Sequence, residues 1–394
     1  MSPTRKKNRG SAPLDTMIVM GTRPEVMKLA PVALELKRYP RRFRVSLVGT
    51  GQHRDLVPQH LEQFDLRLDH DLKVMKRRQT LADITARTVQ RMDALLADGH
   101  PDVLVVEGDT TAVLIAALAA FYRQIPVAHV EAGLRSGDAY NPFPEEMNRR
   151  LVAPLAGVHF APTAAARENL LREGIAAERI FVTGNTAVDA LLLAAKQRPA
   201  QPAQRGQWLS GRRMVLVTAH RRESWGQGIR QISLALRDLA ERFEDIVVVY
   251  AVHPNPVVRE TAGKVLRGVE RVHLIGPPEH IAFVDLMKRC YLILTDSGGI
   301  QEEAPSLGKP VLVLRRTTER TEGVEAGCSE LVGTERARIV KRASALLSDP
   351  AEYEAMVAKR NPYGDGKAAR RIRRALAYHF GLDRRRPPDF GAAG

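Results

Sequence analysis

Short apolar runs alternate with segments of helical periodicity along most of this chain, and this alternation limits the folds that it can adopt. In the first half, the runs fall at residues 17–20, 45–48, 103–106, 126–130, 158–161 and 180–183. The pattern restarts after residue 211, with runs at 214–218, 246–251, 272–275, 291–295 and 311–314. Strands that alternate with helices form parallel sheets with right-handed crossovers. We therefore predict an α/β fold of two Rossmann-like parallel-sheet domains that face each other across a cleft.

The segment between the two arrays is rich in Gln, Pro, Arg and Gly, which is typical of a linker. A chain of 394 residues is also long for a single core. A C-terminal helix rich in Arg and Ala could pack back on the first domain. The predicted boundaries are a basic tail at 1–14, a first domain at 15–197, a linker at 198–211, a second domain at 212–365, the C-terminal helix at 366–381 and a second tail at 382–394.

The net charge of +15 invites a nucleic-acid interpretation. Much of the excess lies in the tails and in scattered arginines, however, and no DNA- or RNA-binding motif accompanies it. We therefore expect a preference for small anionic molecules and no nucleic-acid partner. No apolar run approaches membrane-spanning length, and the basic N-terminus lacks the apolar core of a secretory signal, so we expect a cytoplasmic protein without a membrane partner.

Residues 291–308 carry the most suggestive single pattern. An apolar strand stops at Asp296, Ser297, Gly298 and Gly299 allow a tight turn, and a helix is predicted from residue 300 onward. Free N–H groups at the positive end of a helix dipole suit a phosphate. Glu302 and Glu303 would repel that phosphate, so at least one of them is expected to turn toward hydroxyls such as those of a ribose. An ordinary α/β turn with acidic residues at the helix start explains the pattern equally well.

A second anion contact is predicted where the first apolar run ends. Gly21 permits a tight turn, Pro24 suits the first position of a helix, and Arg23 and Lys28 supply positive charge near the helix N-terminus. The alternative is a solvated basic turn. Residues 49–54 are a near miss to a dinucleotide-binding fingerprint and lack its third glycine, so we expect no nicotinamide cofactor.

Three carboxylates fall at strand ends or in adjacent loops: Asp109, Glu131 and Glu145. The C-terminal ends of parallel strands open on one crevice, which makes these residues candidates for acid/base chemistry. Helix capping explains Asp109 almost as well as catalysis does, whereas no cap explains Glu131. His220 also follows a strand and precedes two arginines, which favours a phosphate contact. The motifs of metal sites and P-loops are missing, and the two cysteines form no cluster, so neither metal nor P-loop chemistry is supported.

Taken together, these segments resemble the non-hydrolysing UDP-N-acetylglucosamine 2-epimerase family. The resemblance runs in order from residue 17 to about residue 380 and is specific as a set. The matching motifs lie at 21–25 (GTRPE), 107–111 (EGDTT), 129–135 (HVEAGLR), 144–149 (PEEMNR), 183–186 (TGNT), 220–224 (HRRES), 295–305 (TDSGGIQEEAP) and 361–365 (NPYGD).

The resemblance implies a glycosyltransferase-B-like fold with UDP held mainly by the second domain. It also implies a homodimer, reversible conversion of UDP-GlcNAc to UDP-ManNAc, and neither a metal nor a redox cofactor. By motif match, the acid/base set is Asp109, Glu131 and Glu145, with His220 steadying the diphosphate. The substrate contacts implied by the resemblance are Arg23, Lys28, Phe283, Ser297, Gly298, Gly299, Glu303 and Arg320. A second UDP-GlcNAc, bound as an allosteric activator, is implied at Gln52, Gln79, Arg221 and His253.

The chemistry of the sugar agrees with this set of residues. The C2 proton of an N-acetylhexosamine is not flanked by a carbonyl, so elimination of UDP to 2-acetamidoglucal and re-addition is the available route to epimerisation. Four alternatives remain open: a hydrolysing epimerase that releases ManNAc and UDP, a 2-epimerase of a related UDP-diacetamido sugar, a glycosyltransferase, and a non-catalytic binder of nucleotide sugars or nucleic acid. Three strand-end carboxylates argue against nucleic-acid binding.

Overall fold

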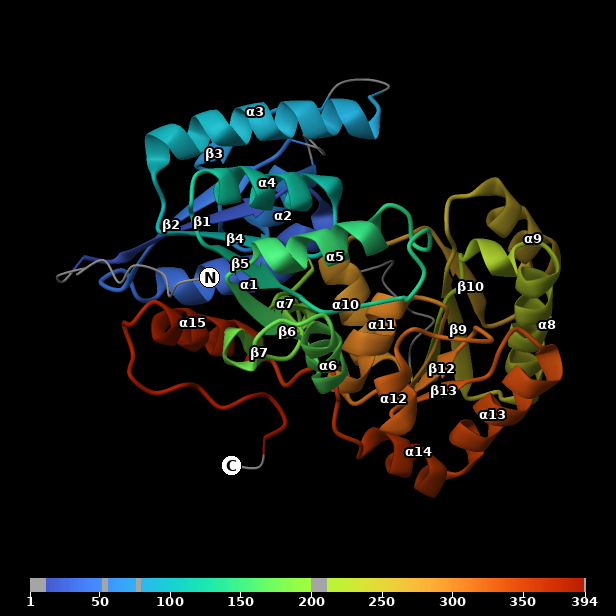
Figure 1. Ribbon diagram of the computed structural model, residues 1–394. Helices are drawn as coiled ribbons and strands as arrows, with labels where there is room; N and C mark the ends of the chain where they lie inside the picture. The colour runs from blue at the N-terminus through green and yellow to red at the C-terminus, as the bar shows by residue number, and fades with distance from the viewer. Residues whose placement is uncertain (1–11, 52–55, 76–78, 200–210, 393–394) are drawn as a thin grey trace. The chain divides into compact units, whose positions relative to one another are not determined.

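The computed structural model of the protein describes residues 12–51, 56–75, 79–199 and 211–392 (Figure 1). The chain divides into two compact units, Met1–Ala190 together with Gly364–Gly394, and Leu191–Tyr363. Each unit is built on one parallel sheet with helices packed against it. The predicted α/β class with two Rossmann-like parallel-sheet domains is therefore confirmed.

The sheet of the first unit has the strand order β3-β2-β1-β4-β5-β6-β7, and every neighbouring pair is parallel. Its central strands are buried along almost their whole length, as expected for a sheet covered on both faces. Because the chain order reverses between β1 and β4, their C-terminal ends form the topological switch point, where open α/β sheets bind ligands. The strands are β1 (Leu14–Met20), β2 (Phe43–Gly49), β3 (His70–Asp71), β4 (Val103–Glu107), β5 (Val127–Val130), β6 (Val158–Ala161) and β7 (Ile180–Val182).

The helices of this unit connect successive strands, and several have caps that the sequence encodes. Thr80, Thr110 and Thr163 each accept a backbone N–H at a helix start. The helices are α1 (Arg23–Lys37), α2 (Leu56–Glu62), α3 (Leu81–Gly99), α4 (Thr111–Tyr122), α5 (Glu145–Leu155), α6 (Ala164–Arg172), the short 3-10 helix η1 (Ala177–Arg179), α7 (Thr186–Ala194) and α15 (Ala368–His379). None of the helices in the described ranges combines the length and the apolar character that crossing a bilayer requires.

The sheet of the second unit repeats the arrangement with the order β10-β9-β8-β11-β12-β13, again parallel throughout. Its switch point lies between β8 and β11. The strands are β8 (Arg213–Thr218), β9 (Ile246–Ala251), β10 (Val272–Ile275), β11 (Leu292–Thr295), β12 (Val311–Val313) and β13 (Ser329–Leu331). The helices are η3 (Arg222–Ser224), α8 (Gln227–Arg242), α9 (Pro256–Leu266), α10 (His280–Arg289), α11 (Gly298–Glu303), η4 (Ala304–Leu307), α12 (Thr321–Glu325), α13 (Arg336–Ser348) and α14 (Pro350–Val357).

The division between the units falls inside α7, before the predicted end of the first domain at residue 197. The physical reason is the packing of the last turn of α7. Leu191 and Ala194 are buried in an apolar cluster with Met214 and Leu216 of β8, so this turn belongs to the core of the second unit. Most of the predicted linker, residues 200–210, lies outside the described residues.

The helix at the C-terminal end of the chain belongs to the first unit, where α15 packs against α1. The carboxylate of Asp189 in α7 accepts the first two N–H groups of α15, from Ala368 and Ala369 (3.1 and 2.9 Å). Arg373 pairs with Glu35 of α1 at 2.8 Å. These contacts satisfy both the N-terminus of the helix and its buried arginine.

The last residues continue along β7, which is the edge strand of this sheet. The N–H of Phe390 donates to the carbonyl of Val182 (2.7 Å), and the Asp389 carboxylate accepts the N–H of Val182 (2.9 Å). The Arg386 guanidinium lies 4.0 Å from the centroid of the Phe181 ring. Residues 386–390, within the segment that the sequence suggested to be a tail, thus satisfy backbone groups of a sheet edge.

Two glycines near the end of β5 offer a matched test of the packing in the first unit. Gly133 and Gly137 both have positive φ angles (91° and 85°), but a Cβ at Gly133 would lie 2.2 Å from the carbonyl oxygen of Ala166, whereas a Cβ at Gly137 would meet open space. We expect Gly137→Ala to cost about 1 kcal/mol for the left-handed backbone. Gly133→Ala should cost at least about 3 kcal/mol, because α6 must move. Urea unfolding curves of the two variants measure this difference, and equal midpoints would contradict it.

Candidate active site

One lysine and two glutamates form the centre of the polar cluster in the first unit. The Lys28 ammonium of α1 lies 2.6 Å from Glu131 Oε1 and 3.0 Å from Glu107 Oε1. Glu107 ends β4, and Glu131 directly follows β5, where its backbone is left-handed (φ 60°). The second oxygen of Glu131 accepts a hydrogen bond from Asn185 Nδ2 at 3.0 Å. The predicted residues Lys28 and Glu131 are therefore brought together at the switch point.

Burial dominates the electrostatics of this cluster. It raises the pKa of Glu107 well above its ordinary value, although the Lys28 ammonium opposes the shift. Burial also raises the pKa of Glu25, whose Oε2 accepts the N–H groups of Gly21 and Thr22 (2.5 and 3.3 Å). Glu25 thereby fixes the turn between β1 and α1. A charged Glu107 or Glu131 depends on the nearby ammonium much more strongly than a carboxylate in water would.

His129 holds the neighbouring turn in place. Its Nε2 lies 2.8 Å from the carbonyl oxygen of Gly108, between β4 and Asp109, and burial lowers its pKa to about 4. A neutral ring with its proton on Nε2 donates to this carbonyl. The adjacent strand places His159 beside it in register, also buried and with its pKa lowered by burial to about 3. These two histidines are neutral parts of the scaffold.

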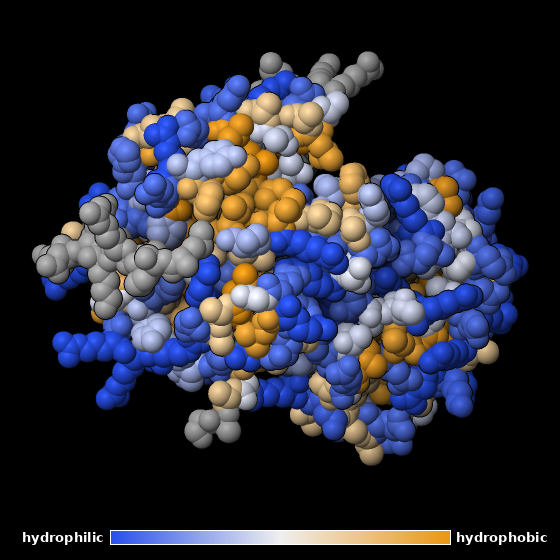
Figure 2. Space-filling view, viewed as in Figure 1, coloured by the Kyte–Doolittle hydropathy of each residue, from blue (hydrophilic) through white to orange (hydrophobic). Residues whose placement is uncertain are grey.

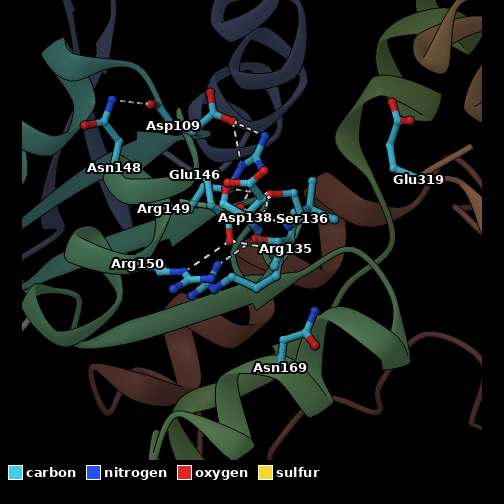
Figure 3. Close-up of polar contacts among 12 residues, drawn as sticks. Asp109, Arg135, Ser136, Asp138, Glu146, Asn148, Arg149, Arg150, Asn169 and Glu319 are labelled. Atoms are coloured by element: carbon cyan, nitrogen blue, oxygen red, sulfur yellow. Dashed lines mark hydrogen bonds and ion pairs between the residues drawn. The ribbon is translucent and has the colours of Figure 1, made fainter. Parts of the chain in front are cut away.

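The Asp109 carboxylate is part of an ion-pair network with charged side chains of α5. Arg149 lies between Asp109 (2.7 Å) and Glu146 (3.2 Å), and Asn148 Nδ2 donates to the backbone carbonyl of Asp109 at 2.8 Å (Figure 3). Glu146 is fully buried and also accepts the N–H of Ser136 at 2.9 Å. Burial would raise the pKa of Glu146, but the Ser136 amide and the arginines of α5 outweigh it, so that the pKa falls below its ordinary value.

Glu145 and Glu146 are adjacent in sequence but differ in environment. Glu146 is buried and saturated by amides and arginines, whereas Glu145 is the first residue of α5 and is half-buried. Among the described residues, the Glu145 side chain makes no hydrogen bond or ion pair. Arg23 is exposed at the first position of α1 and likewise has no ion-pair partner in the described ranges. Both side chains are thus available to a ligand.

In the second unit, a buried aspartate organises the loop that carries His220. Asp296 follows β11 and is fully buried. Its Oδ2 accepts the N–H groups of His220 (2.6 Å) and Arg221 (2.8 Å), and its Oδ1 lies 3.2 Å from His220 Nδ1. Burial lowers the pKa of His220, although Asp296 opposes the shift. This arrangement joins the ends of β8 and β11 at the second switch point.

The Ser-Gly-Gly turn lies directly beside this aspartate. The N–H of Ser297 donates to Thr295 Oγ1 at 3.0 Å, and Gly298 and Gly299 begin α11. Arg320 lies over Gly298, where an added Cβ would be 3.2 Å from its guanidinium carbon. Its Nε donates to Glu302 at 2.8 Å, and the neighbouring Glu303 is half-buried. The ring of Phe283 in α10 packs partly against the core of this unit.

Three of the four residues that the resemblance assigns to an activator site can be described. Gln79 donates to the sulfur of Met75 and accepts from Arg87, while the exposed ring of His253 stacks on that of His220 with centroids 5.5 Å apart. Arg221 follows His220 in the loop that Asp296 holds. Gln52 lies outside the described residues. The activator site stays a prediction.

Several residues of these clusters were not identified from the sequence. Glu107 and Asp296 were seen only as strand ends, and Glu25, Glu146 and Arg149 only as parts of motifs. A charged residue at the last position of a fully apolar strand was the available signal for Glu107. The described residues contain no group of three or more His, Cys, Asp and Glu side chains arranged to hold a metal ion.

Comparison with known proteins identifies the family. The model of the UDP-N-acetylglucosamine 2-epimerase family matches residues 34–377. The UDP-N-acetylglucosamine 2-epimerase of Bacillus subtilis is 51% identical over 377 residues, covering 96% of this chain and 98% of that protein. The enzyme of the same name from Escherichia coli K12 is 50% identical over 370 residues, covering 92% of this chain and 98% of that protein.

A solved structure gives the same result. The UDP-GlcNAc 2-epimerase from Neisseria meningitidis, bound to UDP-GlcNAc, superposes with a TM-score of 0.80 at 44% identity, covering 92% of this chain and 99% of that chain. The match therefore extends over nearly all of this chain. The chain belongs to the UDP-N-acetylglucosamine 2-epimerase family, a family of enzymes, and the resemblance seen in the sequence is confirmed.

A variant without the Lys28 ammonium tests whether this group stabilises both Glu107 and Glu131. Lys28→Met leaves Glu107 and Glu131 as two neighbouring carboxylates without that cation, so we expect a loss of about 3 kcal/mol in stability. Without the ammonium that opposes the shift, the raised folded-state pKa of Glu107 should rise further. An acid with a raised folded-state pKa stabilises the fold below its unfolded pKa and loses that contribution as pH rises, so the penalty should grow from about pH 5 to about pH 8.

The measurement is the thermal midpoint of Lys28→Met against wild type across this pH range. Lys37→Met is the matched control, because Lys37 is an exposed residue at the end of the same helix. It should leave the midpoint nearly unchanged at every pH. A penalty of Lys28→Met that does not depend on pH would contradict the shared-charge interpretation.

Proposed function

We propose that this protein interconverts UDP-GlcNAc and UDP-ManNAc without hydrolysis. The observation that carries the proposal is the environment of Glu131. Its two carboxylate oxygens contact Lys28 and Asn185, and both of these partners are side chains. A carboxylate oriented in this way at a switch point is suited to removing and returning a proton.

The proposed reaction proceeds by elimination and re-addition. A base removes the proton at C2 while the C1–O bond breaks, and the electron pair of that bond leaves with UDP. The product is 2-acetamidoglucal. UDP then adds again at C1 while a proton is delivered to C2 from the opposite face. Two faces require at least two acid/base groups, which is the reason for proposing more than one carboxylate.

Asp109, Glu131 and Glu145 are the proposed acid/base set. Glu131 has side-chain partners, Asp109 is paired with Arg149, and Glu145 is half-buried without a protein partner in the described ranges. Each of these arrangements can change when a sugar binds. Arg23, which is exposed at the start of α1, and Lys28 are proposed to contact the substrate from this unit.

The second unit is proposed to hold the nucleotide. Gly298 and Gly299 would present backbone N–H groups to phosphate at the start of α11, with the side chain of Ser297 and His220 beside them. Glu303 is proposed to bind the ribose, as the resemblance to the family implies. The remaining proposed contacts to nucleotide or sugar are Phe283 and Arg320. The UDP-GlcNAc complex of the Neisseria meningitidis relative supports a UDP-sugar as the ligand class.

Proton NMR of UDP-GlcNAc with the enzyme in heavy water tests this proposal. We expect a growing anomeric signal of UDP-ManNAc, together with deuterium at C2 of the product and of recovered substrate. Accumulation of free ManNAc and UDP would identify a hydrolysing epimerase instead. An unchanged spectrum would contradict the proposed substrate and point to a related UDP-sugar or to a non-catalytic role.

In the same assay, Glu131→Gln should lower kcat by about 100-fold to 10,000-fold, because an amide cannot accept the C2 proton. UDP affinity, measured by calorimetry, should stay within about threefold of wild type. Glu178→Gln is the control, because Glu178 is exposed on η1. Near-normal turnover of Glu131→Gln would remove Glu131 from the mechanism.

We also propose that the protein is a homodimer, with a second copy covering α4. This helix contains no charged residue, although part of it faces outward (Figure 2). Helices that are apolar on all sides are normally buried, and exposed apolar patches mark interaction sites. Phe121 and Tyr122 of α4 are 43% and 66% exposed, and the packed helix α5 adds exposed Met147 and Leu151.

Sedimentation of the double variant Phe121→Asp and Tyr122→Asp tests this interface. Both side chains are already exposed in the protomer, so the fold should persist, while two carboxylates in an apolar interface should produce monomers. Val257→Asp is the control, because Val257 is 43% exposed on α9 of the other unit. A wild-type monomer, or a variant that remains dimeric, would contradict the proposed interface.

A further inference from the structure

Asp296 has two separate tasks for its two oxygens. Oδ2 accepts the consecutive N–H groups of His220 and Arg221, at 2.6 and 2.8 Å. This contact fixes the backbone of the loop after β8. Trp225 fixes the same loop from the other side, since its Nε1 donates to the carbonyl of His220 at 3.0 Å.

The second oxygen, Oδ1, faces the imidazole ring of His220. It is buried and accepts no regular hydrogen bond from the residues that the structure describes, and His220 Nδ1 lies 3.2 Å away. A buried carboxylate oxygen without a donor is costly. A proton on Nδ1 would attract this oxygen across the 3.2 Å that separates the two atoms, whereas a lone pair there would repel it. The geometry therefore selects the ring form that carries a proton on Nδ1.

From this geometry we infer that Asp296 is a positioning residue that fixes the tautomer of His220, so that Nδ1–H donates to Asp296 and Nε2 is the nitrogen presented to the nucleotide diphosphate. The inference rests on the proposed function for its ligand. The other groups that face the ring are Arg221, the stacked ring of His253 and Glu223. Of the two acids near the ring, Asp296 and Glu223, Asp296 is fully buried and lies 3.2 Å from the ring nitrogen Nδ1.

This tautomer has a consequence for phosphate binding. A neutral ring with its proton on Nδ1 would present a lone pair at Nε2, which repels a phosphate oxygen. His220 can donate from Nε2 only after it takes up a second proton, and the imidazolium is then stabilised by Asp296 on one side and by diphosphate on the other. UDP binding above the pKa of His220 should therefore be accompanied by proton uptake from the solvent.

Asp296→Asn separates the two tasks of this residue. The amide oxygen can still accept the two backbone N–H groups, while the amide nitrogen becomes a donor facing Nδ1. Nδ1 must then accept, and the neutral ring carries its proton on Nε2. The neutral ring can now donate to phosphate without taking up a proton. A related substitution in the serine protease triad acts by the same change of tautomer.

Nitrogen NMR of histidine-labelled protein at about pH 8 tests the tautomer in the absence of any ligand, where an unperturbed imidazole is neutral. The signals of His220, one of 11 histidines, are assigned with the variant His220→Gln. We expect Nδ1–H in wild type and Nε2–H in Asp296→Asn. Wild type with Nε2–H would overturn the inference, whatever reaction the enzyme catalyses and even if the variant fails to fold.

Calorimetry of UDP binding in buffers of different ionisation enthalpy supplies the second readout. At about pH 8, wild type should take up as much as about one proton per UDP, and Asp296→Asn should take up much less. Trp225→Phe is the control, because it loosens the same loop without touching the carboxylate, and it should retain the uptake. Equal uptake by wild type and Asp296→Asn would overturn the inference, whereas absence of UDP binding by wild type would instead contradict the proposed function.

Discussion

The parallel arrangement of the strands decides where this protein can carry its chemistry. Strands that are buried on both faces leave little room for polar side chains along their length, and most of the polar groups considered above lie at or beyond the C-terminal strand ends. Two such ends meet at each switch point, β1 with β4 and β8 with β11. Glu107, which ends β4, and Asp296, which follows β11, are both buried there. The functional clusters follow from the topology of the sheets.

Buried carboxylates in this protein are repeatedly satisfied by pairs of consecutive backbone N–H groups. Glu25 accepts from residues 21 and 22, Asp189 from residues 368 and 369, and Asp296 from residues 220 and 221. Each pair comes from a turn, a loop or a helix start, where the N–H groups have no partner in regular structure. An acid bound in this way fixes the backbone without requiring a buried cation. This explains how loops at both switch points are held rigidly beside the proposed ligand sites.

The sequence predicted the elements best where apolar runs were long. Residues 246–251 and 272–275 coincide with β9 and β10, whereas β1 begins earlier than predicted because Asp15 and Thr16 interrupt the apolar pattern. β13 was missed because it has only three residues and contains Glu330. The start of α9 carries recognisable signals, because Asn255 caps the helix and Pro256 begins it.

The candidate site was predictable only as a list of residues. Motifs identified Lys28, Glu131, Asp109 and His220, but their partners are set by the tertiary fold. Lys28 was predicted as an anion contact, and in the structure its ammonium lies between two carboxylates. Asp296 lies far from His220 in sequence, so no local pattern could join them. Distances of this kind depend on the strand order, which a single sequence does not contain.

The groups that contact each carboxylate indicate whether that carboxylate has a structural or a chemical role. Backbone N–H groups cannot move away without unfolding a turn, so Glu25 and Asp189 are bound to the scaffold. Side-chain partners can rotate toward a ligand, and Glu131 and Asp109 have side-chain partners of this kind. Asp296 combines the two, because one oxygen binds the backbone while the other faces a titratable ring. Asp296 therefore links the backbone of the loop after β8 to the protonation of the His220 ring.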